Sequence, residues 1–132
     1  MTPNTPASYL RKAQRTLQTA RLLLAQADAE GACNRAYYAM FDAAHAALWA
    51  VGAQEPGAVV KTHSGLIALF GHELVKAGRI DAVHGRALGQ VQKVRLIADY
   101  TADPPPSGDA QDAVAQAEAF VAAIEAAFFA AG

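Results

Sequence analysis

The segment from Ala32 to Val51 constrains the fold more than any other, because it has the length of a helix but lacks a charged face. Its sequence, ACNRAYYAMFDAAHAALWAV, contains no Lys or Glu and is followed by Gly52. An exposed helix normally turns charged side chains toward solvent. We therefore expect a central helix that is covered on most of its sides.

Four further segments have apolar residues at steps of three and four, the spacing of an amphipathic helix. We predict these helices at residues 7–29, 62–76, 81–100 and 109–131. Glycines and prolines separate them, and Gly31 is expected to end the first helix in the left-handed conformation. Sustained strand-like alternation is absent from the sequence. Short loops make neighbouring helices antiparallel, so we predict an all-α, up-and-down four-helix bundle core with a fifth helix.

The chain has 132 residues, which is the size of one domain. We expect a single domain over residues 1–132, ordered from 7 to 131 after a flexible N-terminus at 1–6. The only cysteine, Cys33, has no partner for a disulfide or a zinc site, and no metal or cofactor is expected. Residues 1–12 lack the apolar run typical of a leader peptide, and no apolar run reaches the length of a membrane span, so we expect a cytoplasmic protein.

Charge and composition limit the partners. The net charge of −1 argues against a general DNA-binding protein. Charged residues make up 17% of the chain, against about 25% in ordinary domains. So few charges indicate either a surface covered by another subunit or a general bias toward alanine. Together with apolar residues such as Trp49 and Phe129, the low charge leads us to expect a homodimer.

A stripe of polar and aromatic side chains interrupts the central helix. On a helical wheel, Tyr38, Asp42, His45 and Trp49 fall within about 80° of Arg35. A shielded charge is costly unless it is paired. Two turns separate Arg35 from Asp42, so each is expected to meet a group from another helix. The stripe is either a polar network that fixes the packing or part of a groove that binds an anion.

Other segments offer residues that complete such a groove. Arg95 and Asp99 are four residues apart, a spacing that lets their side chains touch on a helix. Lys61 and His63 stand at the start of the third helix, where free backbone amides favour anions.

Three motifs, "NRAYYAMFDAAHAAL", "KTHSGLIALFG" and "VRLIADY", resemble those of small prokaryotic HEPN (higher eukaryotes and prokaryotes nucleotide-binding) proteins. The resemblance extends from about Ser8 to Phe128 and implies an all-α bundle with an up-and-down four-helix core. It also implies a function, because many HEPN proteins are metal-independent, RNA-cleaving toxins that act as dimers. Others, especially of this small type, are encoded beside a minimal nucleotidyltransferase, which is their antitoxin or partner.

The ribonuclease type of HEPN protein has an Arg followed, after four to six residues, by a His on a late helix. The arginine that matches is Arg95, but no His follows it at the motif positions, and Asp99 and Tyr100 stand in that region. Arg79 and His84 have the right spacing across the turn before the fourth helix, which we interpret as coincidence.

The missing histidine leaves catalysis open, because His is the usual general acid or base at neutral pH. Arg95 alone suits the binding of a phosphate. Proton transfer would need a substitute such as His45 or His63 from another helix, with Tyr100 a weaker candidate.

Three functions remain open from the sequence. The first is a HEPN module of a toxin–antitoxin-like or nucleotidyltransferase-associated system that binds nucleotide or RNA phosphate in a polar groove between helices. The second is a metal-independent ribonuclease toxin that acts as a dimer, and the third is a non-catalytic interaction bundle. The candidate catalytic residues are Arg95, His45 and His63, and the candidate ligand-binding residues are Arg35, Tyr38, Asp42, Lys61, Asp99 and Tyr100.

Overall fold

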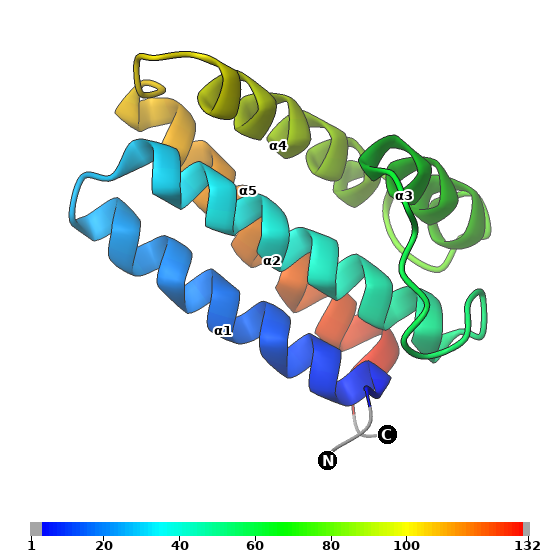
Figure 1. Ribbon diagram of the computed structural model, residues 1–132. Helices are drawn as coiled ribbons and strands as arrows, with labels where there is room; N and C mark the ends of the chain where they lie inside the picture. Colours follow the sequence, from blue (N-terminus) through cyan, green and yellow to red (C-terminus); the bar gives the residue numbers. More distant parts are fainter. Residues whose placement is uncertain (1–3, 131–132) are drawn as a thin grey trace.

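The computed structural model describes residues 4–130, which form helices and no strand (Figure 1). The α-helices are α1 (Pro6–Ala25), α2 (Ala29–Ala50), α3 (His63–Phe70), α4 (Ala82–Tyr100) and α5 (Ser107–Ile124). Helices α3 and α5 continue as short π-helical segments, η1 (Gly71–Val75) and η2 (Glu125–Phe129). Helices α1, α2, α4 and α5 make the long up-and-down bundle and α3 is the additional helix, which confirms the predicted fold class.

Helix α2 lies at the centre of this bundle, as its missing charged face predicts. It packs against α1, α4 and α5 and also meets α3. All of its residues from Ala32 to Trp49 are buried or half-buried. Many of them are alanines, whose small side chains let the neighbouring helices approach closely. The core around α2 is completed by large side chains such as Phe70 and Phe120, whose ring centroids lie 5.2 Å apart.

The turn between α1 and α2 differs from the prediction. Helix α1 ends at Ala25, and Ala27 takes the positive φ of 62° that was expected of Gly31. Asp28 is the N-cap of α2 and accepts a hydrogen bond from the Gly31 amide at 2.8 Å. A Cβ atom on Gly31 would lie only 2.5 Å from Oδ2 of Asp28. A side chain at this position would therefore displace the Asp28 carboxylate from the cap, and Gly31 itself lies inside α2.

The remaining helix ends lie close to those predicted. The Thr62 side chain caps α3, and Asp81 caps α4 by accepting a hydrogen bond from the Val83 amide. Helix α5 begins directly after the prolines at 104–106, two residues earlier than expected.

The N-terminal segment expected to be flexible includes part of the first helix. Thr5 and Ser8 form a capping box, and Pro6 is the first helical residue, where its missing N–H costs nothing. Residues 1–3 of that segment, and Ala131 at the other end, lie outside the described residues. Within residues 4–130, no helix has the length and apolar character needed to cross a membrane.

Candidate functional site

Arg95 is a buried arginine on the side of α4 that faces α2, with 7% of its surface exposed. Its Nε donates a hydrogen bond to Oε1 of Gln92 at 2.9 Å, and its Nη1 donates to Oδ2 of Asp99 at 2.6 Å. The guanidinium carbon lies 5.1 Å from the ring centroid of Tyr37 and 5.6 Å from that of Tyr38. Its Nη2 has no hydrogen-bond partner within residues 4–130. Arg95 is thus fixed in place with donors left over.

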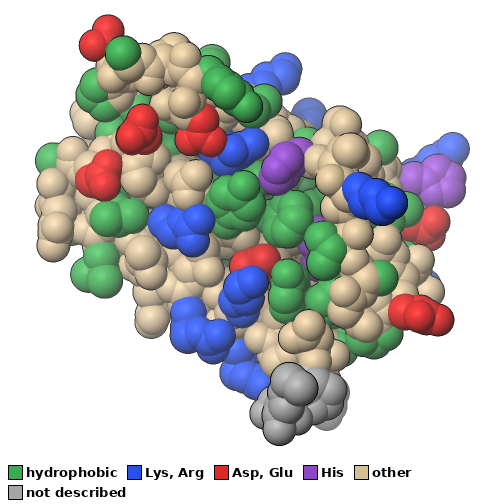
Figure 2. All heavy atoms as spheres, viewed as in Figure 1, with side chains coloured by type: hydrophobic (Ala, Val, Ile, Leu, Met, Phe, Trp, Pro, Cys, Tyr) green, Lys and Arg blue, Asp and Glu red, His purple; other side chains and the backbone are tan. Residues whose placement is uncertain are grey.

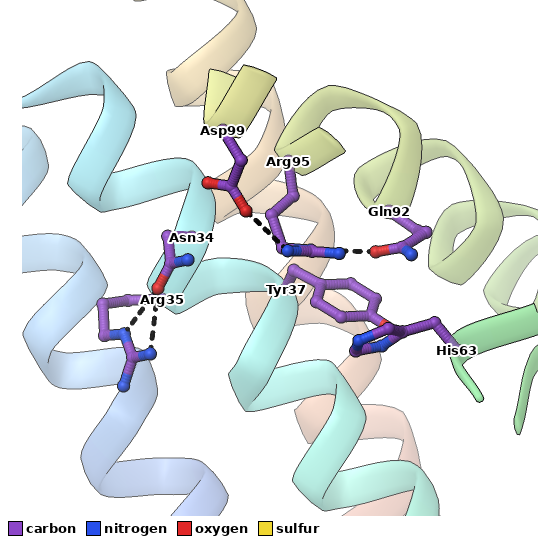
Figure 3. A network of polar contacts seen from close by, with 7 residues as sticks. All are labelled: Asn34, Arg35, Tyr37, His63, Gln92, Arg95 and Asp99. Carbon is purple, nitrogen blue, oxygen red and sulfur yellow. Dashed lines mark hydrogen bonds and ion pairs between the residues drawn. The ribbon is translucent and has the colours of Figure 1, made fainter. Parts of the chain in front are cut away.

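His63 is the first residue of α3 and is joined to α2 by Tyr37. The Tyr37 hydroxyl lies 2.7 Å from Nδ1 of His63, and the tyrosine side chain is fully buried. Burial raises the pKa of Tyr37 despite the nearby charge of Arg95, so the hydroxyl keeps its proton. Burial and the Arg95 charge both lower the pKa of His63, so its imidazole is neutral near pH 7. Tyr37 therefore contacts both an arginine and a histidine (Figure 3).

Two half-buried aromatic rings of α2 lie beside these residues. The Tyr38 ring has the guanidinium carbon of Arg35 at 5.2 Å and that of Arg95 at 5.6 Å, both within the range of cation–π attraction. The Phe41 ring lies 5.5 Å from the ring of His63. We call Tyr37, Tyr38, His63, Arg95 and Asp99 the α2–α3–α4 site, after the three helices that supply them. Figure 2 shows the face above α2, with a histidine beside hydrophobic side chains and Lys and Arg side chains gathered over α1.

Arg35 does not meet the partner on another helix that its shielding predicts. Its Nε and Nη2 both donate to Oδ1 of Asn34, the preceding residue, at 3.0 and 2.9 Å (Figure 3). Arg35 and Asp99 line a pocket of about 420 Å³ whose other residues include Asp28 and Glu30. Three carboxylates there oppose an anion, so we place no phosphate in this pocket.

Asp42 meets the expected partner from another helix. The carboxylate is 5% exposed and lies 3.9 Å from the Nζ of Lys12 on α1. Burial raises its pKa to about 6, although the charges of Lys12 and Arg35 and a hydrogen bond with Tyr9 act in the opposite direction. Asp42 is one helical turn from Tyr38, at the edge of the α2–α3–α4 site.

His45 holds the loop that follows α2. Its Nδ1 lies 3.1 Å from the backbone oxygen of Phe41, and its Nε2 accepts a hydrogen bond from the Val60 amide at 3.1 Å. The indole of Trp49 donates to the oxygen of Ala58 at 2.9 Å. Both imidazole nitrogens of this fully buried histidine are thus occupied, and the structure does not place it with Arg95 and His63 as a group free to move protons.

The other candidates lie at the margin. Lys61 is exposed two positions before His63, and Tyr100 is 83% exposed at the end of α4. No cluster of His, Cys, Asp and Glu within residues 4–130 is arranged to hold a metal ion. A larger groove of about 670 Å³ lies between α1 and α5 and is lined by none of the site residues.

Sequence reasoning missed Tyr37 and Gln92. Tyr37 lies outside the polar stripe of the helical wheel, and spacing alone says nothing about where a tyrosine hydroxyl goes. The available signal was the residue type, because a buried tyrosine usually has a hydrogen-bond partner for its hydroxyl.

The protein is thus an all-α bundle with a buried arginine, a buried tyrosine and a half-buried histidine between its helices. The chain belongs to the HEPN family, since the model of the HEPN domain matches residues 7–127. This confirms the resemblance of its three motifs.

Several relatives align with most of the chain. A UPF0332 protein of Gloeobacter violaceus is 37% identical over 100 residues, which cover 76% of this chain and 75% of the relative. A protein of Methanocaldococcus jannaschii, named "Putative toxin", is 34% identical over 109 residues, which cover 83% of this chain and 78% of the relative. A UPF0332 protein of Thermotoga maritima is 33% identical over 118 residues, which cover 89% of this chain and 86% of the relative.

Proposed function

We propose that this chain is a toxin-like HEPN module that binds RNA phosphate at the α2–α3–α4 site. The observation that supports this most is the position of Tyr37, which contacts Arg95 and His63 at once. Arg95 keeps its Nη2 and His63 its Nε2 without a partner among the described residues. A toxin-like role is supported by the name of the Methanocaldococcus jannaschii relative.

The chemistry of these two groups suits a phosphate. A guanidinium presents donors in a planar fork that matches two phosphate oxygens, and a neutral imidazole adds one more N–H. The contacts with Gln92 and Asp99 hold the guanidinium in place, which reduces the entropy lost when a ligand binds. An interaction bundle without a ligand would be expected to satisfy Arg95 completely from within.

RNA is favoured over a single nucleotide by the surface around the site. Helix α1 contains four basic residues and no acidic one. Lys12 lies 4.9 Å from the ring centroid of Tyr9 and 3.9 Å from Asp42, at the edge of the site. Arg11 and Arg15 are exposed on the same helix and make no ion pair within residues 4–130, and Arg11 also lines the groove between α1 and α5. Tyr38 and Phe41 supply rings on which bases can stack. Basic side chains beside aromatic ones bind the backbone and bases of a single strand longer than one nucleotide.

The binding test is a titration of a fluorescently labelled, single-stranded 12-nucleotide RNA. Arg95→Ala should weaken binding about tenfold or more, since a charge-assisted phosphate contact is lost. Lys93→Ala is the matched control, because Lys93 is an exposed cation on the same helix and should leave affinity within about twofold. Equal affinity for the wild type and the Arg95 variant would overturn the proposed site.

A second function, metal-independent RNA cleavage, is favoured by His63. The linear motif lacks its histidine, but His63 brings an imidazole to the same tyrosine that Arg95 contacts. Incubation of the wild type, Arg95→Ala and His63→Gln with a cellular RNA pool in EDTA tests this function. Cleavage by the wild type alone supports it, while cleavage by none at high protein concentration leaves binding as the role.

We extend the proposal to partners and location on the basis of the family resemblance. The chain is proposed to act as a cytoplasmic homodimer with a nucleotidyltransferase protein as its partner. Light scattering of the purified chain tests whether it forms a homodimer. Co-purification with the product of a neighbouring nucleotidyltransferase gene tests the second partner.

A further inference from the structure

We propose that Tyr37 fixes His63 as the tautomer with its proton on Nε2, and that the N–H donors of His63 and Arg95, beside the Asp99 carboxylate, select a phosphodiester over a terminal phosphate. This inference deepens the proposed function, on which its ligand part rests. It makes Tyr37 a positioning residue that acts through His63.

The tautomer follows from which atom donates. The Tyr37 hydroxyl and Nδ1 of His63 are 2.7 Å apart, so one of the two must donate a hydrogen bond to the other. The buried Tyr37 hydroxyl keeps its proton and has no other acceptor among the described residues. A buried O–H without an acceptor costs free energy, so the hydroxyl is the donor and Nδ1 the acceptor. A neutral imidazole has one proton, and accepting a hydrogen bond at Nδ1 places that proton on Nε2. Nε2 of His63 then offers an N–H, while the lone pair of Nδ1 accepts the hydrogen bond from Tyr37.

The groups that face His63 agree with this assignment. Tyr37, Tyr38 and Phe41 approach its ring from α2, and the charge of Arg95 acts on it from α4. No carboxylate contacts the ring among the described residues, so none there favours protonation of a second nitrogen. In this environment the imidazole is a neutral donor near pH 7.

The selection between phosphates follows from charge. Asp99 lies 2.6 Å from Nη1 of Arg95 and neutralises most of its charge locally. The remaining donors suit the single negative charge of a phosphodiester. A terminal phosphate carries about −1.5 to −2 near pH 7, and the Asp99 carboxylate would repel its second negative charge. An internal RNA linkage therefore fits the site better than a nucleotide monophosphate does.

The tautomer is tested by nitrogen-15 NMR of the histidine rings in the full chain. The His63 signals, assigned with His63→Gln, should show a protonated Nε2 and an unprotonated Nδ1 near pH 7.5. Tyr37→Phe should give a mixture of tautomers, while Tyr9→Phe, a matched loss of a hydroxyl from another ring, should leave His63 unchanged. A proton on Nδ1 in the wild type, or an unchanged ring in Tyr37→Phe, would overturn the assignment.

The selection is tested by competition between uridylyl-uridine, which has one phosphodiester, and uridine monophosphate, at pH 7.5. The dinucleotide should bind at least fivefold more tightly, and Tyr37→Phe should reduce its affinity at least threefold. Tighter or equal binding of the monophosphate would overturn the selection. If neither ligand binds while the tautomer is as predicted, the proposed function fails and the role of Tyr37 in positioning His63 stands. Circular dichroism confirms that Tyr37→Phe is folded before it is compared.

Discussion

The hydroxyl of Tyr37 and Nδ1 of His63 lie 2.7 Å apart, although 26 positions separate the two residues in sequence. The same tyrosine ring lies 5.1 Å from the guanidinium carbon of Arg95. An arginine and a histidine thus reach one site from two helices, α4 and α3, and α2 joins them. This arrangement brings together the residue types that a linear Arg–His motif would have placed on one helix.

Asp99→Asn should relax the selection between phosphates. Its carboxylate neutralises Arg95 and repels a second negative charge, and an amide removes both effects while keeping the size. We expect uridine monophosphate to bind about three- to tenfold more tightly, with a smaller gain for uridylyl-uridine. Calorimetric titration at low salt measures both.

Asp103→Asn is the matched control for that change, because Asp103 is exposed beyond the end of α4. It should leave both affinities unchanged. A gain as large as that of Asp99→Asn would show a general effect of net charge instead.

Arg11→Gln combined with Arg15→Gln should weaken the binding of long RNA and spare the dinucleotide. These two exposed side chains of α1 are placed to contact phosphates away from the α2–α3–α4 site. We expect the affinity for a 12-nucleotide RNA to fall about fivefold. The slope of log affinity against log salt concentration should become shallower by about 1.4, because two phosphate contacts contribute about 0.7 each. The double variant Lys76→Gln with Arg79→Gln, at the turn after η1, should change neither value. Equal losses in the two double variants would contradict a path along α1.

Asp42→Asn should stabilise the protein above pH 6. The folded pKa of about 6 exceeds the ordinary value near 3.8, so the folded state binds the proton more tightly. The stabilisation that comes from this tighter proton binding is complete below about pH 4, and it is lost as the pH rises through 6. Removing the charge should raise the free energy of unfolding by about 1–3 kcal/mol at pH 7.5, with little change at pH 4. Urea unfolding at the two pH values measures the difference, and destabilisation at pH 7.5 would contradict it.

His45→Ala should free the loop between α2 and α3. The neutral imidazole accepts the Val60 amide, and burial lowers its pKa. In the wild type, the stabilisation by neutral His45 is complete above the ordinary histidine pKa near 6.5. It is lost as the pH falls through the lowered pKa of His45 in the folded state. The variant should lose about 2–3 kcal/mol at pH 7.5, because a fully buried ring and two hydrogen bonds disappear. Faster hydrogen exchange at the Val60 amide would locate the effect, and unchanged exchange there would exclude it.

The fold was predictable because its signals are local. Helical periodicity predicts four of the helices, the missing charged face identifies α2 as the central one, and the prolines at 104–106 mark the boundary before α5. The error at the first turn is also local in origin, because Gly31 was interpreted by its conformational freedom. Its actual role depends on the space that the Asp28 cap requires, which only the folded backbone shows.

The site was predictable in part. Arg95 and Asp99 pair at a spacing that the sequence displays, and His63 stands at a helix start. The roles of Tyr37 and His45 were not predictable, because each depends on a contact across the fold. A helical wheel gives the positions of Tyr37 and His45 around α2. It does not show that Tyr37 meets His63 or that His45 accepts a hydrogen bond from the Val60 amide.

The central claim is that RNA phosphate binds between α2, α3 and α4, and chemical-shift mapping tests it most directly. Uridylyl-uridine is titrated into nitrogen-15-labelled protein while the backbone amides and the Nε of Arg95 are followed. The account predicts that the largest shifts fall at Arg95, at His63 and its neighbours, and at residues 37–41 of α2. Shifts confined to the groove between α1 and α5, or no shifts at millimolar ligand, would contradict it.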